Sequence, residues 1–178
     1  MKDVYIVLTD TGSMFTRMIK FFTRKPYNHV SISLDEDLET LYSFGRLKPR
    51  NPFFGGFVEE KIDEGTFALF KNTRALVLQV PVSQEEYERL RYLIHAFLED
   101  KDAYRYNLIG VLGALFDKPI TRKNRYFCSS FVADISNQAG FLPLSRSPHL
   151  VRPDEFTKIE HAEIVYEGLL RNYTKSKR

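Results

Sequence analysis

The chain has 178 residues, of which 43% are hydrophobic and 28% charged, a balance typical of a globular domain and unlike that of a disordered chain. The formal net charge of +3 is too small to indicate nucleic-acid binding, and the single cysteine excludes an internal disulfide and a cysteine-based zinc cluster. No stretch approaches about 18 uninterrupted apolar residues, so we expect one domain over residues 1–178 without an integral membrane segment.

The N-terminal half predicts strands and one short helix. "MKDVYIVLTDTG" has the pattern of a buried strand ending at a turn rather than of a signal peptide, which favours a cytoplasmic protein. Apolar residues at helical spacing predict a helix within residues 14–23, with Ser13 as its cap. "HVSISLD" (29–35) alternates apolar and polar residues and is joined by an acidic turn to "TLYSFGR" (40–46), which predicts a β-hairpin.

The middle of the chain contains one expected loop, three expected strands and one helix. Two prolines and a glycine pair predict an irregular loop over residues 47–56. Ser83 and Glu86 form a capping box, so a helix should begin there. The expected strands are "FVEEKI" at 57–62, "TFALFKN" at 66–72 and "ALVLQVPV" at 75–82.

Two further helices and a last strand are expected after residue 100. "YNLIGVLGALF" (106–116) is apolar with two glycines, and fits either a tightly packed core helix, which we favour, or a surface that faces a membrane or a ligand. In "NRYFCSSFVADI" (124–135) apolar residues recur at three- and four-residue steps from Cys128, which predicts a helix ending at Gly140. With a last strand in "AEIVYEGLL" (162–170), the elements define an α+β fold, an antiparallel sheet packed against helices.

Cysteine chemistry is the clearest functional possibility. A thiol attacks as the thiolate, which is favoured beside a helix N-terminus and an imidazole, and Cys128 stands where its helix should begin. Among the four histidines, His29 starts a strand and lies on the face opposite its apolar residues, a rigid mount for a base. Taken singly, each has an ordinary explanation: a buried core cysteine and a strand-end histidine.

The order of these two segments resembles a known family. "YNHVSISLD…TLYSFGR", followed later by "YFCSSFVADI", is similar to the circularly permuted papain-like hydrolases, the permuted branch of the NlpC-type superfamily that includes the YiiX/YaeF-like amidases. In that branch the strand with the histidine precedes the helix with the cysteine. The resemblance covers roughly residues 3–138, and only the two quoted blocks are specific.

The resemblance implies roles for several residues. Cys128 matches the nucleophile and His29 the general base of a cysteine hydrolase that works through an acyl-enzyme. The third polar residue of the family falls at Ser43, which can accept an imidazole N–H but has no charge to stabilise imidazolium. The backbone N–H of Cys128, helped by a donor for which Tyr27 is a speculative candidate, would form the oxyanion hole.

The sequence leaves the substrate and the class of function open. The implied hydrolase would cleave an amide or ester with a peptide- or lipid-like acyl group, and thiol acyl transfer is a variant of the same chemistry. The aromatic residues of "NPFFGGF" either line an acyl groove or fill the core; they are Phe53, Phe54 and Phe57. A catalytically weak binding module with the same fold, or an interaction domain with a coincidental Cys and His, are the alternatives. No metal site, cofactor or nucleic-acid partner is expected.

Overall fold

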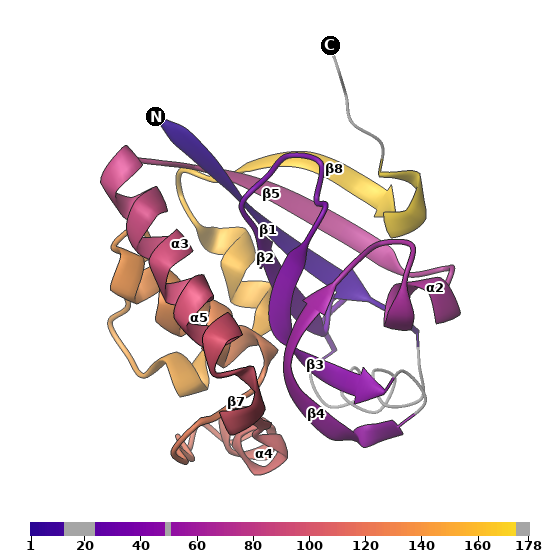
Figure 1. The fold of residues 1–178 in the computed structure, drawn as a ribbon, viewed down its shortest axis with the longest axis vertical. Coiled ribbons are helices and arrows are strands. Elements are labelled where there is room, and N and C mark those ends of the chain that lie inside the picture. The colour runs from indigo at the N-terminus through magenta and orange to yellow at the C-terminus, as the bar shows by residue number, and fades with distance from the viewer. Residues whose placement is uncertain (13–23, 49–50, 174–178) are drawn as a thin grey trace.

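The computed structural model describes residues 1–12, 24–48 and 51–173, and Figure 1 shows its arrangement. A six-stranded antiparallel sheet has the order β4-β3-β2-β1-β5-β8. Its strands are β1 (Lys2–Asp10), β2 (His29–Ser33), β3 (Leu41–Lys48), β4 (Asn51–Glu60), β5 (Arg74–Val82) and β8 (Glu163–Leu169). The short strands β6 (Arg105–Tyr106) and β7 (Arg125–Tyr126) pair in parallel apart from it. The helices are α2 (Gly65–Leu69), α3 (Gln84–Glu99), α4 (Leu108–Leu115) and α5 (Cys128–Ala139).

The central strand β1 is buried on both of its faces. Val4, Ile6 and Leu8 belong to the larger hydrophobic cluster, whereas Tyr5 and Val7 belong to a smaller one on the opposite face of the sheet. A strand covered on both faces has a nearly continuous apolar run, and this is why "VYIVL" lacks alternation. The mixed α+β class with an antiparallel sheet, expected from the sequence, is confirmed.

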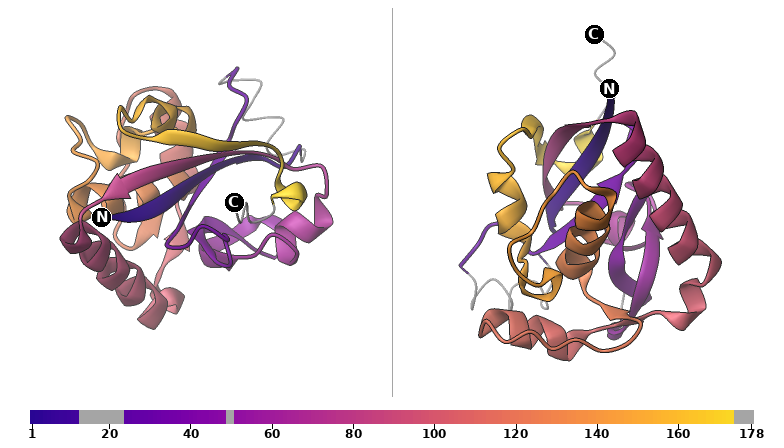
Figure 2. Two further views of the ribbon diagram at one scale, coloured as in Figure 1. Left: turned by 90° about the horizontal axis from the view of Figure 1, so that it is seen from above. Right: turned by 90° about the vertical axis from the view of Figure 1, so that its left-hand side faces the viewer.

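The larger cluster fills the space between the sheet and the helices α3 and α5, which lie side by side in Figure 1. Four aromatic rings, from Phe44 and Phe57 on the sheet, Phe97 on α3 and Phe131 on α5, pack together with centroid separations of 5.0 to 6.1 Å. The smaller cluster contains Phe67 of α2. In the right view of Figure 2, α4 runs along the lower margin of the molecule.

The expected helix ends at both α3 and α5 are confirmed. The Ser83 hydroxyl accepts a hydrogen bond from the Glu86 N–H at 3.2 Å, and the Glu86 carboxylate accepts one from the Ser83 N–H at 2.7 Å. Gly140 follows α5 with a φ of 106°, a left-handed conformation that glycine adopts without strain.

Two expectations for the middle of the chain are wrong. Residues 47–56, expected as a loop, contain the end of β3 and the start of β4; because β4 is an edge strand, Pro52 is tolerated within it. Residues 66–72, expected as a strand, contain α2 followed by a turn, because a helix of five residues is too short to reveal its period. The helix expected within 14–23 lies outside the described residues.

Candidate active site

The first residue of α5 is Cys128, held by the two serines that follow it. The Ser130 hydroxyl accepts a hydrogen bond from the N–H of Phe127 at 2.9 Å and fixes the start of the helix, while the Ser129 hydroxyl donates to the carbonyl of Val151 at 2.7 Å. The apolar side of α5 is anchored in the core, where Phe131 is fully buried. The thiol therefore sits at the electropositive end of a rigidly packed helix.

His29 begins β2, pairs with an acid and lies close enough to Cys128 for the thiol to affect its pKa. Its Nε2 atom lies 2.9 Å from Oε2 of Glu60, the last residue of β4, and the interaction with Cys128 raises the pKa of the imidazole. The Ser31 hydroxyl donates to the same Glu60 oxygen at 3.0 Å, which fixes the position of the carboxylate. The side chains of His29 and Glu60 are only 16% and 11% exposed, so this is a shielded Cys-His-Glu arrangement.

Glu60 reaches His29 across the intervening strand β3. The antiparallel register that pairs Ile32 with Tyr42 places Gly45 opposite His29. A Cβ atom at Gly45 would lie 3.4 Å from Oε1 of Glu60 and 3.7 Å from Cε1 of His29. The absence of a side chain at Gly45 thus leaves the space in which the acid and the imidazole meet.

The surroundings of His29 favour its protonated form. Burial lowers the pKa of His29, because it removes water from the charged ring. The Glu60 carboxylate, its hydrogen bond with the ring and the interactions with Cys128 act in the opposite sense and raise the pKa to about 10. At neutral pH the imidazole is therefore an imidazolium.

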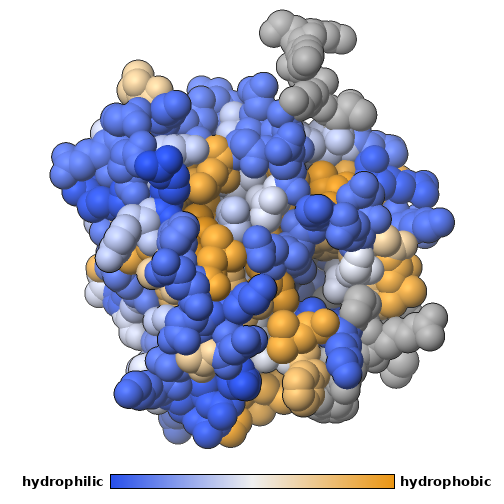
Figure 3. Space-filling model, viewed as in Figure 1, coloured by the Kyte–Doolittle hydropathy of each residue, from blue (hydrophilic) through white to orange (hydrophobic). Residues whose placement is uncertain are grey.

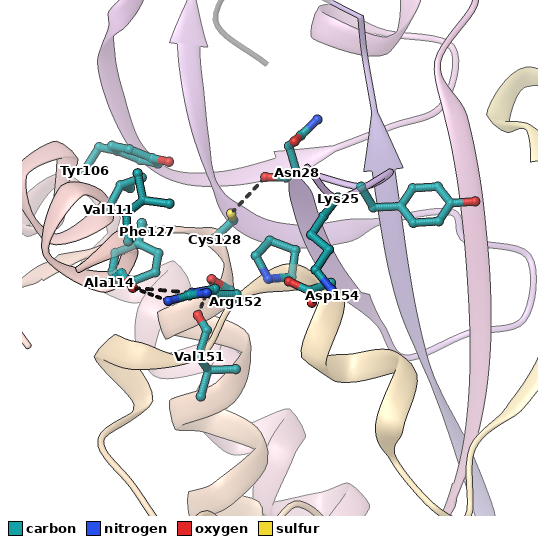
Figure 4. Close-up of a pocket in the computed structure, with 14 residues that line it drawn as sticks. Lys25, Asn28, Tyr106, Val111, Ala114, Phe127, Cys128, Val151, Arg152 and Asp154 are labelled. Carbon is teal, nitrogen blue, oxygen red and sulfur yellow. Dashed lines mark hydrogen bonds and ion pairs between the residues drawn. The ribbon is translucent and has the colours of Figure 1, made fainter. Parts of the chain in front are cut away.

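A narrow pocket of about 50 Å³ opens beside Cys128 (Figure 4). Most of its wall is apolar and comes from α4, from the start of α5 and from the segment 151–153; the apolar residues include Val111, Ala114, Leu115, Phe127 and Val151. Lys25 and Asp154 form an ion pair of 3.1 Å in the wall, and the Arg152 guanidinium donates to the carbonyl of Ala114 at 3.0 Å. The thiol lies 4.0 Å from the carbonyl oxygen of Asn28.

Tyr106, the last residue of β6, is a site residue that sequence reasoning missed. It lines the pocket, and Figure 4 shows its hydroxyl turned toward the side where Cys128 lies. Burial and the charge of the Cys128 thiolate raise the pKa of Tyr106 well above its ordinary value, so its hydroxyl remains a donor. Gly55 permits this approach, since a Cβ atom there would lie 2.8 Å from the Cβ of Tyr106.

Cys128 and His29, expected to act together, are brought together. Ser43 is not the partner of His29: its hydroxyl donates to the carbonyl oxygen of Val30 at 2.7 Å, and Glu60 occupies the place expected for it. Tyr27 lines the pocket, but its hydroxyl donates to the Glu167 carboxylate at 3.0 Å and is committed to that bond.

Two of the phenylalanines expected near an acyl groove, Phe54 and Phe57, do not line the pocket beside Cys128. Phe57 is buried in the aromatic part of the larger cluster, and Phe54 is 59% exposed. The side chain of Phe53 lies outside the described part of the molecule. The sequence did contain one signal for Glu60. In an antiparallel sheet, the alternation of side chains along "FVEEKI" places Glu60 on the same face of the sheet as His29.

The described residues contain no group of three or more His, Cys, Asp or Glu side chains that could hold a metal ion. In the same part of the chain, no helix has the length and apolar character needed to cross a membrane. Comparison of the chain with models of protein families, with curated proteins and with solved structures finds no match.

Proposed function

We propose that this protein is a cysteine hydrolase with a permuted papain-like fold, cleaving an amide or ester through an acyl-enzyme on Cys128. The observation that carries the proposal is the position of His29, which pairs with Glu60 at 2.9 Å and whose pKa the nearby Cys128 raises, while Cys128 itself lines an apolar pocket. A nucleophile beside a base that an acid holds in place is the arrangement that activates a thiol.

In the proposed reaction, the thiolate of Cys128 attacks the carbonyl carbon of the substrate, and a C–S bond forms as the oxygen takes up the negative charge. The His29 imidazolium gives its proton to the leaving amine or alcohol, and the C–N or C–O bond breaks to leave a thioester. Neutral His29 then takes a proton from water, which attacks the thioester. The carboxylic acid leaves, and the thiolate and imidazolium are restored.

The negative oxygen of the intermediate requires donors close to Cys128. The backbone N–H of Cys128 lies in the first turn of α5, where N–H groups have no partner within the helix. Tyr106, which is partly buried and lines the pocket, supplies the second donor through its hydroxyl. This replaces the role expected of Tyr27.

The chain order agrees with the permuted branch that the sequence resembles, since β2 with His29 precedes α5 with Cys128. The apolar wall of the pocket favours a substrate with an apolar acyl group over a charged one. Transfer of the acyl group to an acceptor other than water would use the same first half-reaction. The binding-module alternative rested on the uncharged Ser43, and Glu60 supplies the charge that Ser43 lacks.

Alkylation by iodoacetamide tests the activated thiol without knowledge of the substrate. At mildly acidic pH, where an ordinary thiol reacts slowly, we expect wild-type protein to lose its Cys128 thiol rapidly and His29→Ala to react at least about tenfold more slowly. A rate that is the same in both proteins, and that rises with pH as an ordinary thiol does, would contradict the proposal.

Turnover requires a second assay. A panel of activated esters and amides with acyl chains of increasing length should be hydrolysed by the wild type and not by Cys128→Ser. Trapping of an acyl group on Cys128, observed as a mass increase of the intact protein, would establish the covalent step. Hydrolysis that persists in Cys128→Ser would refute it.

A further inference from the structure

The outer face of α4 exposes an unusual number of large apolar side chains. Leu108, Ile109, Leu112 and Phe116 are 37%, 50%, 53% and 73% exposed. At 100° per residue they fall within one stripe of the helix, and together they form what we call the α4 face. A soluble surface normally carries such residues singly, so a contiguous group indicates an interaction site.

The α4 face stands at the margin of the molecule rather than in a groove. Apolar atoms reach the surface at the lower edge of Figure 3, where Figure 1 places α4, and the right view of Figure 2 shows the helix lying along that edge. A helix that protrudes at an edge can insert its apolar face into a lipid bilayer, at the boundary between the headgroups and the acyl chains.

The chain after α4 supplies positive charge beside this face. It folds back against the helix: the N–H of Lys118 donates to the carbonyl of Gly113 at 2.9 Å, and the Asn107 side chain donates to the carbonyl of Ile120 at 2.9 Å. Gly113 permits the contact, since a Cβ atom there would lie 2.4 Å from the Lys118 carbonyl oxygen. Lys118, Arg122 and Lys123 are all exposed on this segment.

Asp117, the acidic residue of this segment, does not neutralise the positive charges of Lys118, Arg122 and Lys123. Asp117 lies 3.3 Å from the Arg152 guanidinium and 4.0 Å from that of Arg146. The surface next to the α4 face is therefore basic, whereas the net charge of the whole chain is only +3. An apolar helix face flanked by lysine and arginine is the pattern of a helix that lies in the plane of a bilayer.

We propose that the α4 face, with Lys118, Arg122 and Lys123, docks on an anionic lipid bilayer. A second copy of the chain fits less well, because a two-fold contact through α4 would bring the two basic segments together. Docking would also bring the active-site pocket to the lipid surface, since Val111, Ala114 and Leu115 on the adjacent side of α4 line it. The docking itself does not depend on the proposed catalysis.

Flotation of the full chain with vesicles tests the proposal. We expect the wild type to float with vesicles of phosphatidylcholine containing phosphatidylglycerol, to bind phosphatidylcholine alone at least about tenfold more weakly, and to dissociate as the salt concentration rises. Equal binding to both vesicles, or no binding to either, would overturn it.

Two pairs of variants with matched controls locate the surface. Leu112→Ser/Phe116→Ser and Arg122→Glu/Lys123→Glu should each weaken binding to the anionic vesicles at least about tenfold. Ile164→Ser/Val165→Ser, which changes exposed apolar residues of β8, and Lys71→Glu/Arg171→Glu, which reverses exposed charges elsewhere, should leave binding within about twofold of wild type. Far-ultraviolet circular dichroism and thermal unfolding will establish that each variant is folded.

The same variants separate lipid from protein as the occupant. If sedimentation shows that the wild type is a dimer which Leu112→Ser/Phe116→Ser converts to a monomer, and vesicles bind neither, the face is a self-association surface and the proposal is overturned. Binding that the control pairs reduce as much as the α4 pairs would also overturn it. None of these measurements uses Cys128, so the result is independent of the hydrolase assay.

Discussion

At the scale of single residues, the candidate site depends on an imidazole held between two partners. His29 alone at a strand end would have an ordinary pKa, and burial alone would lower it. Glu60 reverses that direction, since its carboxylate lies 2.9 Å from Nε2 and is shielded from water. The charge on Glu60, rather than the mere presence of a hydrogen-bond acceptor, is what keeps the ring protonated.

Replacing Glu60 by Gln should therefore lower the pKa of His29 from its value of about 10, because the amide accepts a hydrogen bond but has no charge to stabilise imidazolium. The His29 Cε1 proton, followed by NMR against pH and assigned with His29→Gln, reports this directly. The ring is protonated below its pKa, so the variant should lose imidazolium at a lower pH than the wild type. Because a weaker imidazolium favours the thiolate less, rapid alkylation of Cys128 should begin at a higher pH in the variant. An unchanged titration would refute the role of Glu60.

Tyr106 should act on the intermediate and not on the thiol. Tyr106→Phe removes only the hydroxyl, and the loss of one oxyanion donor typically reduces kcat by about 10²–10³-fold. We expect a fall of this order in ester turnover, with the rate of Cys128 alkylation within about twofold of wild type. A parallel fall in both rates would show instead that the hydroxyl activates the thiol.

At the scale of the elements, the site is where one helix end meets three neighbouring strands. The strand with His29 and the helix with Cys128 could be predicted from the sequence, because each has a strong local period. Glu60 could not be assigned, because its contact crosses an intervening strand and depends on a missing side chain at Gly45. The alternation of side chains places both Ser43 and Glu60 on the face of His29 and could not distinguish them. The Ser43 hydroxyl donates instead to the backbone carbonyl of Val30 in β2.

Gly45 offers a test of this reasoning. A valine there would place methyl groups where Glu60 and His29 now meet, since even a Cβ atom would lie 3.2 Å from Cγ2 of Val58 and 3.4 Å from Oε1 of Glu60. Gly45→Val should slow alkylation of Cys128 at mildly acidic pH by about as much as Glu60→Gln, and Gly45→Ala should have a smaller effect. Wild-type reactivity in a folded Gly45→Val protein would mean that Glu60 does not need this space.

At the scale of the whole molecule, the sheet separates two hydrophobic clusters with different relations to the site. The larger one contains Phe131 of α5 and thus supports the helix that carries Cys128, whereas the smaller one contains Phe67 of α2 on the opposite face. Both side chains are buried, at 0% and 4% exposure, so each contributes to stability. Of the two, the first is packed under the helix that carries Cys128.

The same truncation in each cluster should therefore separate stability from site geometry. Phe131→Leu and Phe67→Leu should each lower the free energy of unfolding by about 1–2 kcal/mol, measured by urea denaturation, because each leaves a partly filled cavity. Under native conditions Phe131→Leu should also slow Cys128 alkylation, since α5 can shift against Phe44 and Phe97 and move the thiol relative to His29. Phe67→Leu should not, because Phe67 belongs to the cluster on the opposite face of the sheet and no residue of α2 lines the pocket beside Cys128. Equal slowing in both variants would mean that reactivity follows global stability, and that the packing of α5 has no specific part in placing the thiol.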